Sequence, residues 1–213
     1  ILSPGQGNDF VYGEKGDDVL VLTRSGTQHF DGGEGVDKFE IYLPDWKTAP
    51  EGFLGAVDLN LGFAGSATDP DNLLNDSLTN IENVTIVAEY AYEITGNDAN
   101  NILVGGSGDD ILKTGDGNDQ LFGGLGDDIL IINGTGDSVL DGGDGIDTFR
   151  IDLTTYTLTE SPVEIQFEVD RTLFTAKNSF FDNASVEVKI TDADGNQWTG
   201  SDGLSGGAGG SGK

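Results

Sequence analysis

The chain has 213 residues, and its 38 acidic against 10 basic side chains give it a formal charge of -28. Glycine accounts for 34 residues, about 16% against a typical usage of about 7%, and both Gly and Asp favour turns over helices. This composition excludes an α-helical protein and a nucleic-acid binder, which needs a basic face, and no apolar run approaches the roughly 20 residues that span a bilayer.

A nine-residue repeat begins near the N-terminus and returns in the second half of the chain. The first segment, Pro4–Glu40, reads PGQGNDFVY and GEKGDDVLV, then, after an extra Leu22, TRSGTQHFD and GGEGVDKFE. The second segment, Gly96–Arg150, reads GNDANNILV, GGSGDDILK, TGDGNDQLF and GGLGDDILI, then, after an extra Ile132, NGTGDSVLD and GGDGIDTFR. The common frame is G-G-x-G-x-D-x-U-x, in which U is an apolar residue.

These frames resemble the repeats-in-toxin (RTX) nonapeptide, the hemolysin-type calcium-binding repeat. The resemblance covers under half of the chain. It implies an all-β fold, in which blocks of parallel β-roll alternate with short non-repeat β segments packed on them. It also implies a secreted bacterial protein that binds several Ca²⁺ ions and is exported unfolded by a type I secretion system.

The frame also has a direct physical interpretation. Six Gly-rich residues make a tight turn, and the next three form a short strand whose central side chain points to one face. Two frames make one coil, so that each frame lies over the next but one. The central apolar residues are expected to stack into a core: Val11, Leu20, Phe30, Phe39, Leu103, Leu112, Leu121, Leu130, Leu140 and Phe149.

Aspartates at the sixth position then line up between adjacent coils, beside turn carbonyls. Such oxygen ligands suit Ca²⁺, and the absence of cysteine excludes thiolate sites. The expected pairs are Asp110–Asp128, Asp128–Asp147, Asp18–Asp37 and Asn101–Asp119, with poorer partners at Asp9–Gln28 and Asp119–Ser138. The candidate metal-binding residues are Asp9, Gly16, Asp18, Gly35, Asp37, Asn101, Gly106, Gly108, Asp110, Gly115, Gly117, Asp119, Gly124, Gly126, Asp128, Gly143, Gly145 and Asp147.

The segments between the blocks lack the nonapeptide but contain the strand-like stretches GAVDLNL, NIENVTIVA, VEIQFEV and ASVEVKITDADGNQW. In the last stretch, Asp194 and Gly195 indicate a hairpin turn. The segment Asp76–Val84 resembles the phrase that commonly precedes a repeat block in bacterial RTX arrays. Because Val19–Leu22 is apolar throughout, we expect the spacer strands to cover the roll. The expected organisation is a roll block (1–40), a spacer (41–95), a second roll block (96–150), a spacer with a hairpin (151–198), and the start of a further block or an added tail (199–213).

The two blocks superpose when Pro4 is aligned with Thr114, which places DGGEGVDKFEIYL over DGGDGIDTFRIDL. With the absence of methionine, this duplication predicts a fragment of a tandem array, such as the calcium-stiffened stalk of a surface adhesin. The expected partners are calcium, the neighbouring repeat units of the same chain, and a glycan or a host or biofilm surface. Neither nucleic acid nor a membrane span is expected, and the location is expected to be extracellular.

An enzyme is not expected. Adjacent acids recur from frame to frame, which suits ligation better than a unique acid/base pair, and the single histidine, His29, provides no Ser-His-Asp constellation. Two other roles stay open. One is a carbohydrate-binding accessory module, for which Trp46 and Trp198 are the candidate contacts, and the other is the C-terminal secretion or folding region of a secreted hydrolase or toxin.

Overall fold

The computed structural model describes residues 1–5, 7–23, 26–43, 54–66, 75–152, 185–191 and 197–203. All regular structure in these residues is β-strand, and none of them forms a helix long and apolar enough to cross a membrane. The chain divides into two compact units, Ile1–Arg150 and Ile151–Lys213. The first unit is a β-solenoid of about six turns, which confirms the expected parallel β-roll.

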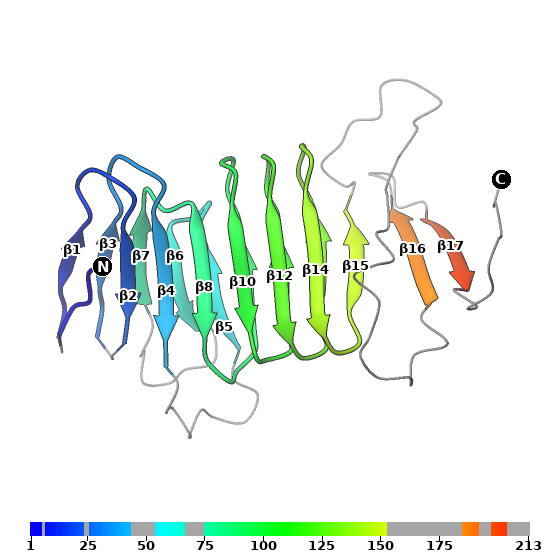
Figure 1. Cartoon of the computed structure of the whole chain (residues 1–213), viewed down its shortest axis with the longest axis horizontal. Helices are drawn as coiled ribbons and strands as arrows, with labels where there is room; N and C mark the ends of the chain where they lie inside the picture. The colour runs from blue at the N-terminus through cyan, green and yellow to red at the C-terminus, as the bar shows by residue number, and fades with distance from the viewer. Residues whose placement is uncertain are drawn as a thin grey trace. The chain divides into compact units, whose positions relative to one another are not determined.

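One face of the solenoid is sheet A, whose strands lie side by side in Figure 1. In spatial order they are β14 (Val139–Asp144), β12 (Gln120–Leu125), β10 (Ile102–Gly106), β8 (Asn83–Val87), β4 (Lys38–Tyr42) and β2 (Val19–Leu22). Every neighbouring pair is parallel. Parallel neighbours need a crossover, and here each crossover passes through the opposite sheet.

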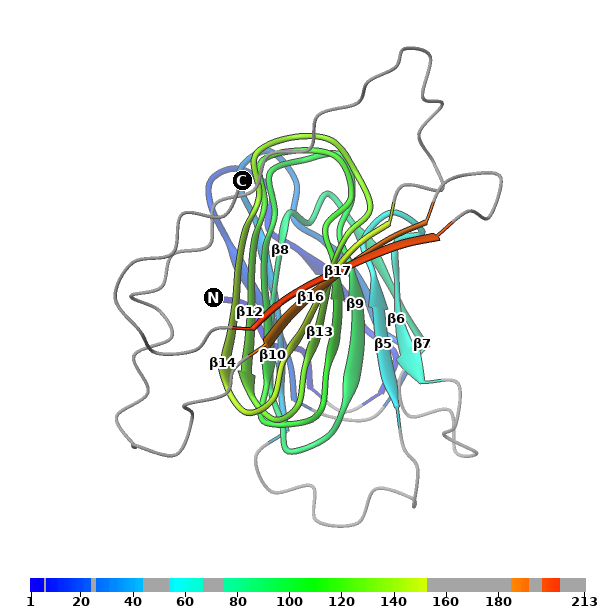
Figure 2. The same cartoon turned by 90° about the vertical axis from the view of Figure 1, so that its right-hand side faces the viewer.

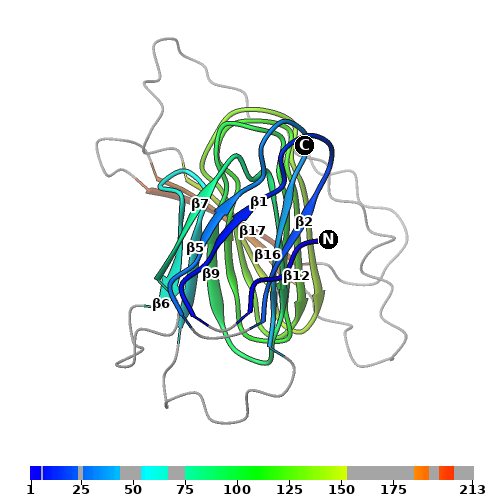
Figure 3. The same ribbon diagram turned by 90° about the vertical axis from the view of Figure 1, so that its left-hand side faces the viewer.

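The opposite face is sheet B. In spatial order its strands are β1 (Phe10–Tyr12), β3 (His29–Asp31), β7 (Asn75–Thr79), β6 (Phe63–Ser66), β5 (Gly55–Asp58), β9 (Tyr92–Thr95), β11 (Ile111–Lys113), β13 (Ile129–Ile132) and β15 (Thr148–Ile151). Strand β6 is antiparallel to both of its neighbours. The end-on views in Figures 2 and 3 show the coils as flattened loops, with the two sheets facing each other across the core.

The strand register confirms that a frame lies over the next but one. Leu103 pairs with Leu121 in sheet A, and Leu112 pairs with Leu130 in sheet B, so each residue meets its equivalent two frames further along the chain. Where an extra residue enters the repeat, the sequence separation between partners grows by one, as from Leu121 to Leu140. The insertion is therefore absorbed without a loss of register in the strands.

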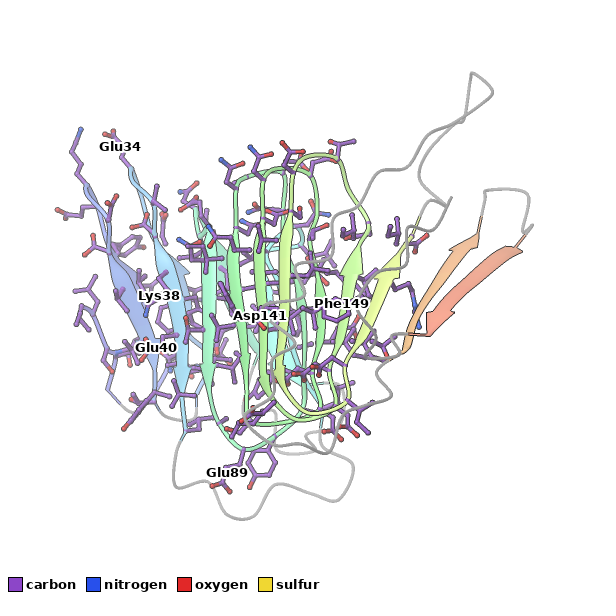
Figure 4. All side chains as sticks on the ribbon, turned by 45° about the vertical axis from the view of Figure 1, so that its right-hand side comes forward. Glu34, Lys38, Glu40, Glu89, Asp141 and Phe149 are labelled. Atoms are coloured by element: carbon purple, nitrogen blue, oxygen red, sulfur yellow. The ribbon has the colours of Figure 1, made fainter. Side chains whose placement is uncertain are left out.

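The core includes the apolar residues that the frame predicts, together with spacer residues such as Val57 and Ile94. Leu140 and Phe149, in the last coil, are partly buried and pack against it. The other predicted core residues are buried: Val11, Leu20, Phe30, Phe39, Leu103, Leu112, Leu121 and Leu130. Side chains from both sheets fill the space between them (Figure 4).

The spacer 41–95 corrects one prediction. Its described strands do not cover the roll but join it edge to edge: β8 lies between β4 and β10 in sheet A, and β5, β6, β7 and β9 lie within sheet B. Strand β8 alternates like a frame strand and buries Val84 and Ile86, while its backbone pairs with both neighbours. Pairing both edges satisfies backbone groups that a covering strand would leave open. The described strands of residues 1–150 therefore form one continuous solenoid.

The second unit contains a hairpin of β16 (Ser185–Thr191) and β17 (Gln197–Gly203). The two strands are antiparallel, with Thr191 opposite Gln197, as the alternating pattern predicts. The expected turn residues Asp194 and Gly195, and the strand-like VEIQFEV, lie outside the described residues.

Candidate metal centres

The sixth frame position lies at the end of each turn, just before the strand begins, so its side chains stack in two rows along the solenoid. Row A precedes the strands of sheet A and comprises Asp18, Asp37, Glu82, Asn101, Asp119 and Ser138. Row B lies beside the strands of sheet B and has two stretches: Asp9, Gln28 and Asp76, then Asp110, Asp128 and Asp147. Asp76 is the second residue of β7 and joins the row because β7 pairs with β3 in the register that aligns Ser77 with His29. Strands β6, β5 and β9 lie between the two stretches of row B.

Row B joins successive coils through the pairs that the frame spacing predicts. The backbone N–H of Asp110 donates to Oδ1 of Asp128 over 2.8 Å, and the N–H of Asp128 donates to Oδ1 of Asp147 over 3.1 Å. The other oxygens of Asp110 and Asp128, their Oδ2 atoms, are buried and have no hydrogen-bond partner. A buried carboxylate oxygen without a donor is costly, and a cation is the ligand that would satisfy it.

The first glycine of the frame makes room beside these oxygens. A Cβ added at Gly105 would lie 2.5 Å from Oδ2 of Asp110 and 2.7 Å from the carbonyl oxygen of Gly123 on the next coil. Gly123 stands in the same relation to Asp128 Oδ2 and to the carbonyl of Gly142. Each site therefore brings a carboxylate oxygen of one coil close to a carbonyl oxygen of the next. This donor set fits Ca²⁺, which prefers hard oxygen ligands.

Burial dominates the electrostatics of row B. It raises the pKa of Asp110 to about 8, where the hydrogen bond from Tyr92 opposes the shift and the charges of Asp128 and Asp109 add to it. Burial likewise raises the pKa of Asp128 to about 6, against the hydrogen bond from Asp110. The phenol pKa of Tyr92 is also raised, first by burial and then by the charge of Asp110. None of the ion pairs found among the described residues includes these carboxyls, and a divalent ion would supply the compensating positive charge.

Row A is less uniform. The N–H of Asp18 donates to Oδ1 of Asp37 over 2.7 Å, which matches the geometry of row B. Further along, the N–H of Asn101 donates to Oδ1 of Asp119 over 2.9 Å. The N–H of Asp119 donates to the hydroxyl oxygen of Ser138 and not to a carboxylate, over a longer 3.4 Å.

The Asp119 position differs from Asp110 and Asp128 in a second way. Its frame begins with Thr114, so a fully buried branched side chain stands where the frames of Asp110 and Asp128 have glycine. Burial raises the pKa of Asp119 to about 6, and its Oδ2 is buried without a partner. We therefore expect Asp119 to be a poorer ligand than Asp128, in line with the Ser138 partner that the sequence predicts.

At Asp9, the structure brings in the partner that the spacing predicts, but with different chemistry. The N–H of Asp9 donates to Oε1 of Gln28 over 3.0 Å, and Nε2 of Gln28 donates to the carbonyl of Gly7 over 2.5 Å. Asn101 acts similarly, since its Nδ2 donates to the carbonyl of Glu82 over 2.6 Å. An amide side chain at the sixth position thus forms hydrogen bonds with backbone groups of the neighbouring coil and needs no cation.

Most of the predicted turn glycines lie against the backbone of an adjacent coil. At Gly124, for example, φ is 114° and an added Cβ would collide with the carbonyl of Gly106 on the preceding coil. Left-handed φ together with a backbone contact restricts such a position to glycine. The candidates with a positive φ are Gly16, Gly35, Gly106, Gly115, Gly117, Gly124, Gly126, Gly143 and Gly145, and an added Cβ at Gly108 would meet the backbone of Tyr90.

Adjacent acids in one frame have separate contacts. The fifth-position Asp109 accepts a hydrogen bond at Oδ1 from the N–H of Asp127 over 2.9 Å, and this side chain is exposed. Asparagine does the same at Asn100, which accepts from the N–H of Asn118 over 2.8 Å. The fifth position therefore caps the next turn without needing a charge, whereas the sixth holds a buried carboxylate. The two acids of a frame therefore make different hydrogen bonds.

Two further acids take sixth-position places although no repeat frame contains them. Asp76 accepts the N–H of Gln28 at Oδ1 over 2.6 Å, and Glu82 accepts the N–H of Asp37 at Oε2 over 2.7 Å. Burial raises the pKa of Asp76 to about 7, against the hydrogen bond from Gln28. These positions have one signal in the sequence: an acid stands two residues before a buried apolar residue, as in Asp76-Ser77-Leu78. This spacing is that of the sixth and eighth positions of the frame, but the glycines of the frame are missing.

The remaining candidates add no second kind of centre. No group of three or more His, Cys, Asp or Glu side chains within the described ranges converges on a metal position. His29 stacks on Phe10 at 4.5 Å and shares a 2.6 Å hydrogen bond with Ser77. Trp46 and the side chain of Trp198 lie outside the described residues, and carbohydrate binding through them stays a prediction.

The sequence comparisons agree with this geometry. The family model of the RTX calcium-binding nonapeptide repeat matches residues 5–23 and 95–130, with four copies. No curated protein matches the chain. Residues 26–40 and 133–150, which come after the matched segments, belong to the same solenoid although the match does not extend over them. Residues 5–23 and 95–130 therefore match the RTX calcium-binding nonapeptide repeat, and they lie in the two blocks of one β-solenoid.

Proposed function

We propose that this chain is a calcium-dependent structural module of a larger secreted RTX protein, which folds and stiffens when extracellular Ca²⁺ fills its rows. The observation that carries the proposal is the series of buried Oδ2 atoms without a hydrogen-bond partner, at Asp9, Asp37, Asp76, Asp110, Asp119 and Asp128. A chain of charge -28 gains a stable fold when cations neutralise such groups.

The proposed setting is the extracellular space. Calcium sites of extracellular modules have a Kd of about 10⁻⁴–10⁻³ M, so cytosolic calcium leaves them empty and acid repulsion keeps the chain open for export. Outside the cell, tenfold excess over Kd stabilises the folded state by about 1.4 kcal/mol at each site. Continuous pairing of both blocks with the spacer supports a stalk-like role in an adhesin or similar exoprotein.

Calcium binding is tested by equilibrium dialysis of the whole chain against Ca²⁺ in the range of about 10⁻⁵–10⁻² M, with Mg²⁺ as the control ion. We expect several Ca²⁺ ions per chain with affinities in the millimolar to sub-millimolar range. Mg²⁺ is expected to bind far more weakly because it requires near-ideal octahedral geometry and dehydrates reluctantly. Binding of fewer than two Ca²⁺ ions, or equal uptake of both ions, would contradict the proposed function.

A further inference from the structure

The spacer supplies oxygen ligands where it joins the first repeat block. The coil next to Asp37 is built from spacer residues and contains no repeat frame. In this coil only Asn80, Ile81 and Glu82 connect β7 to β8. This short turn nevertheless places Asn80 and Glu82 against the last turn of the first block. Neither residue lies within the matched repeat segments.

The contacts at this joint reproduce those of the Asp110 site. A Cβ added at Gly32 would lie 2.5 Å from Oδ2 of Asp37 and would collide with the carbonyl oxygen of Asn80 on the next coil. At Gly105 the corresponding atoms are Oδ2 of Asp110 and the carbonyl oxygen of Gly123. The carboxylate of Glu82 accepts the N–H of Asp37, as Asp128 accepts that of Asp110.

The charge at the joint is uncompensated. Asp37 has no exposed surface; its Oδ1 accepts the N–H of Asp18, and its Oδ2 is buried without a hydrogen-bond partner. The ion pairs found among the described residues are Lys15–Glu34, Lys38–Glu40 and Lys113–Glu93, and none includes Asp37 or Glu82. Figure 4 shows Glu34 at a turn and Lys38 beside Glu40 on the sheet. A cation is therefore the missing partner of this buried carboxylate.

We propose that Asp37, Glu82 and the carbonyl of Asn80 hold a Ca²⁺ ion that clamps the spacer to the first repeat block. The proposal rests on the proposed function, because it assigns the same ion to residues outside the repeat. Two carboxylates and a carbonyl are hard ligands of the kind Ca²⁺ prefers, and water completes its six to eight contacts. The site makes folding of the spacer depend on calcium as folding of the repeats does.

The test replaces Glu82 by Gln. Gln28 shows that glutamine fits the sixth position, since it accepts the N–H of Asp9 and donates to the carbonyl of Gly7. Glu82→Gln is therefore expected to fold in saturating Ca²⁺, as circular dichroism would verify. The matched control is Glu89→Gln, because Glu89 is exposed and lies between β8 and β9, at the lower edge of the ribbon in Figure 4. Both variants lose one charge.

Equilibrium dialysis then separates the outcomes. We expect Glu82→Gln to bind one Ca²⁺ ion fewer, or to bind one ion at least about tenfold more weakly, while Glu89→Gln matches the unaltered chain. Equal isotherms for Glu82→Gln and the unaltered chain would overturn the inference and leave the proposed function standing. If the unaltered chain binds no calcium, the proposed function fails and the inference fails with it.

Discussion

Replacing Asp128 by Asn is expected to weaken calcium binding at row B while stabilising the calcium-free fold. Asparagine keeps an oxygen that can accept the N–H of Asp110, but it removes the charge of the buried Oδ2. Its amide nitrogen would face the carbonyl of Gly142, to which it can donate. Losing a charged ligand is expected to lower the affinity of that site by a factor of about 10–100, which corresponds to about 1.4–2.8 kcal/mol.

The neighbouring acid provides the control. Asp127 accepts the N–H of Ile146 at Oδ1 over 2.8 Å and is exposed, and Asn118 makes the same contact with Asp137 over 2.9 Å. Asp127→Asn removes the same charge but keeps this hydrogen bond, so calcium affinity is expected to change by less than about threefold. Calorimetric titrations of both variants distinguish the two positions. Equal losses in the two variants would show that net charge, and not the sixth-position site, governs binding.

Acidification in EDTA is expected to restore the fold that chelation removes. Burial raises the pKa of Asp110 to about 8, that of Asp76 to about 7, and those of Asp119 and Asp128 to about 6, from an ordinary value of 3.8. Because the folded state holds these protons more tightly than the unfolded chain, it gains stability at low pH. That stability is fully present below about pH 4 and is lost as the pH rises through 6 to 8.

In EDTA the free energy of unfolding is therefore expected to be larger at pH 5 than at pH 8, by an amount on the order of a few kcal/mol, so the folded fraction is larger at pH 5. In millimolar Ca²⁺ the dependence reverses, since protons compete with the ion for the same carboxylates. Circular dichroism over this pH range measures the pH dependence of folding in EDTA and in Ca²⁺. The variant Asp110→Asn should flatten the curve in EDTA although it changes the net charge by only one unit. Parallel pH profiles in EDTA and in Ca²⁺ would contradict this explanation.

The sequence predicts the roll well because one short frame specifies turn, strand and core together. Its glycines fix the turn, its eighth residue fixes the core, and the coil of two frames follows, as the pairing of Leu112 with Leu130 confirms. The sixth-position pairs also follow from this period, and Asp110 meets Asp128 as expected. Their role as calcium ligands stays a prediction that the binding experiments test.

The spacer is less predictable because its turns lack the glycines that mark a frame. Asp76 and Glu82 join the rows through long-range pairing of β7 with β3 and of β8 with β4, and no local spacing reveals such pairing. The apolar Val19–Leu22 indicates burial on both faces, yet Val19 and Val21 are half-buried without a covering spacer strand in the described part of the chain. The spacer strands pair edge to edge with the roll, and do not lie over it as expected, because this pairing gives hydrogen-bond partners to the backbone N–H and C=O groups along the strand edges.

The most direct measurement is far-UV circular dichroism of the whole chain at pH 8 as free Ca²⁺ is raised from chelated to millimolar levels. Calcium is expected to convert a coil spectrum into a β spectrum cooperatively, because each ion binds only where two coils have come together, and Mg²⁺ at the same concentration is expected to leave the coil unchanged. A β spectrum of equal strength in EDTA, with no further change on adding Ca²⁺, would contradict the account.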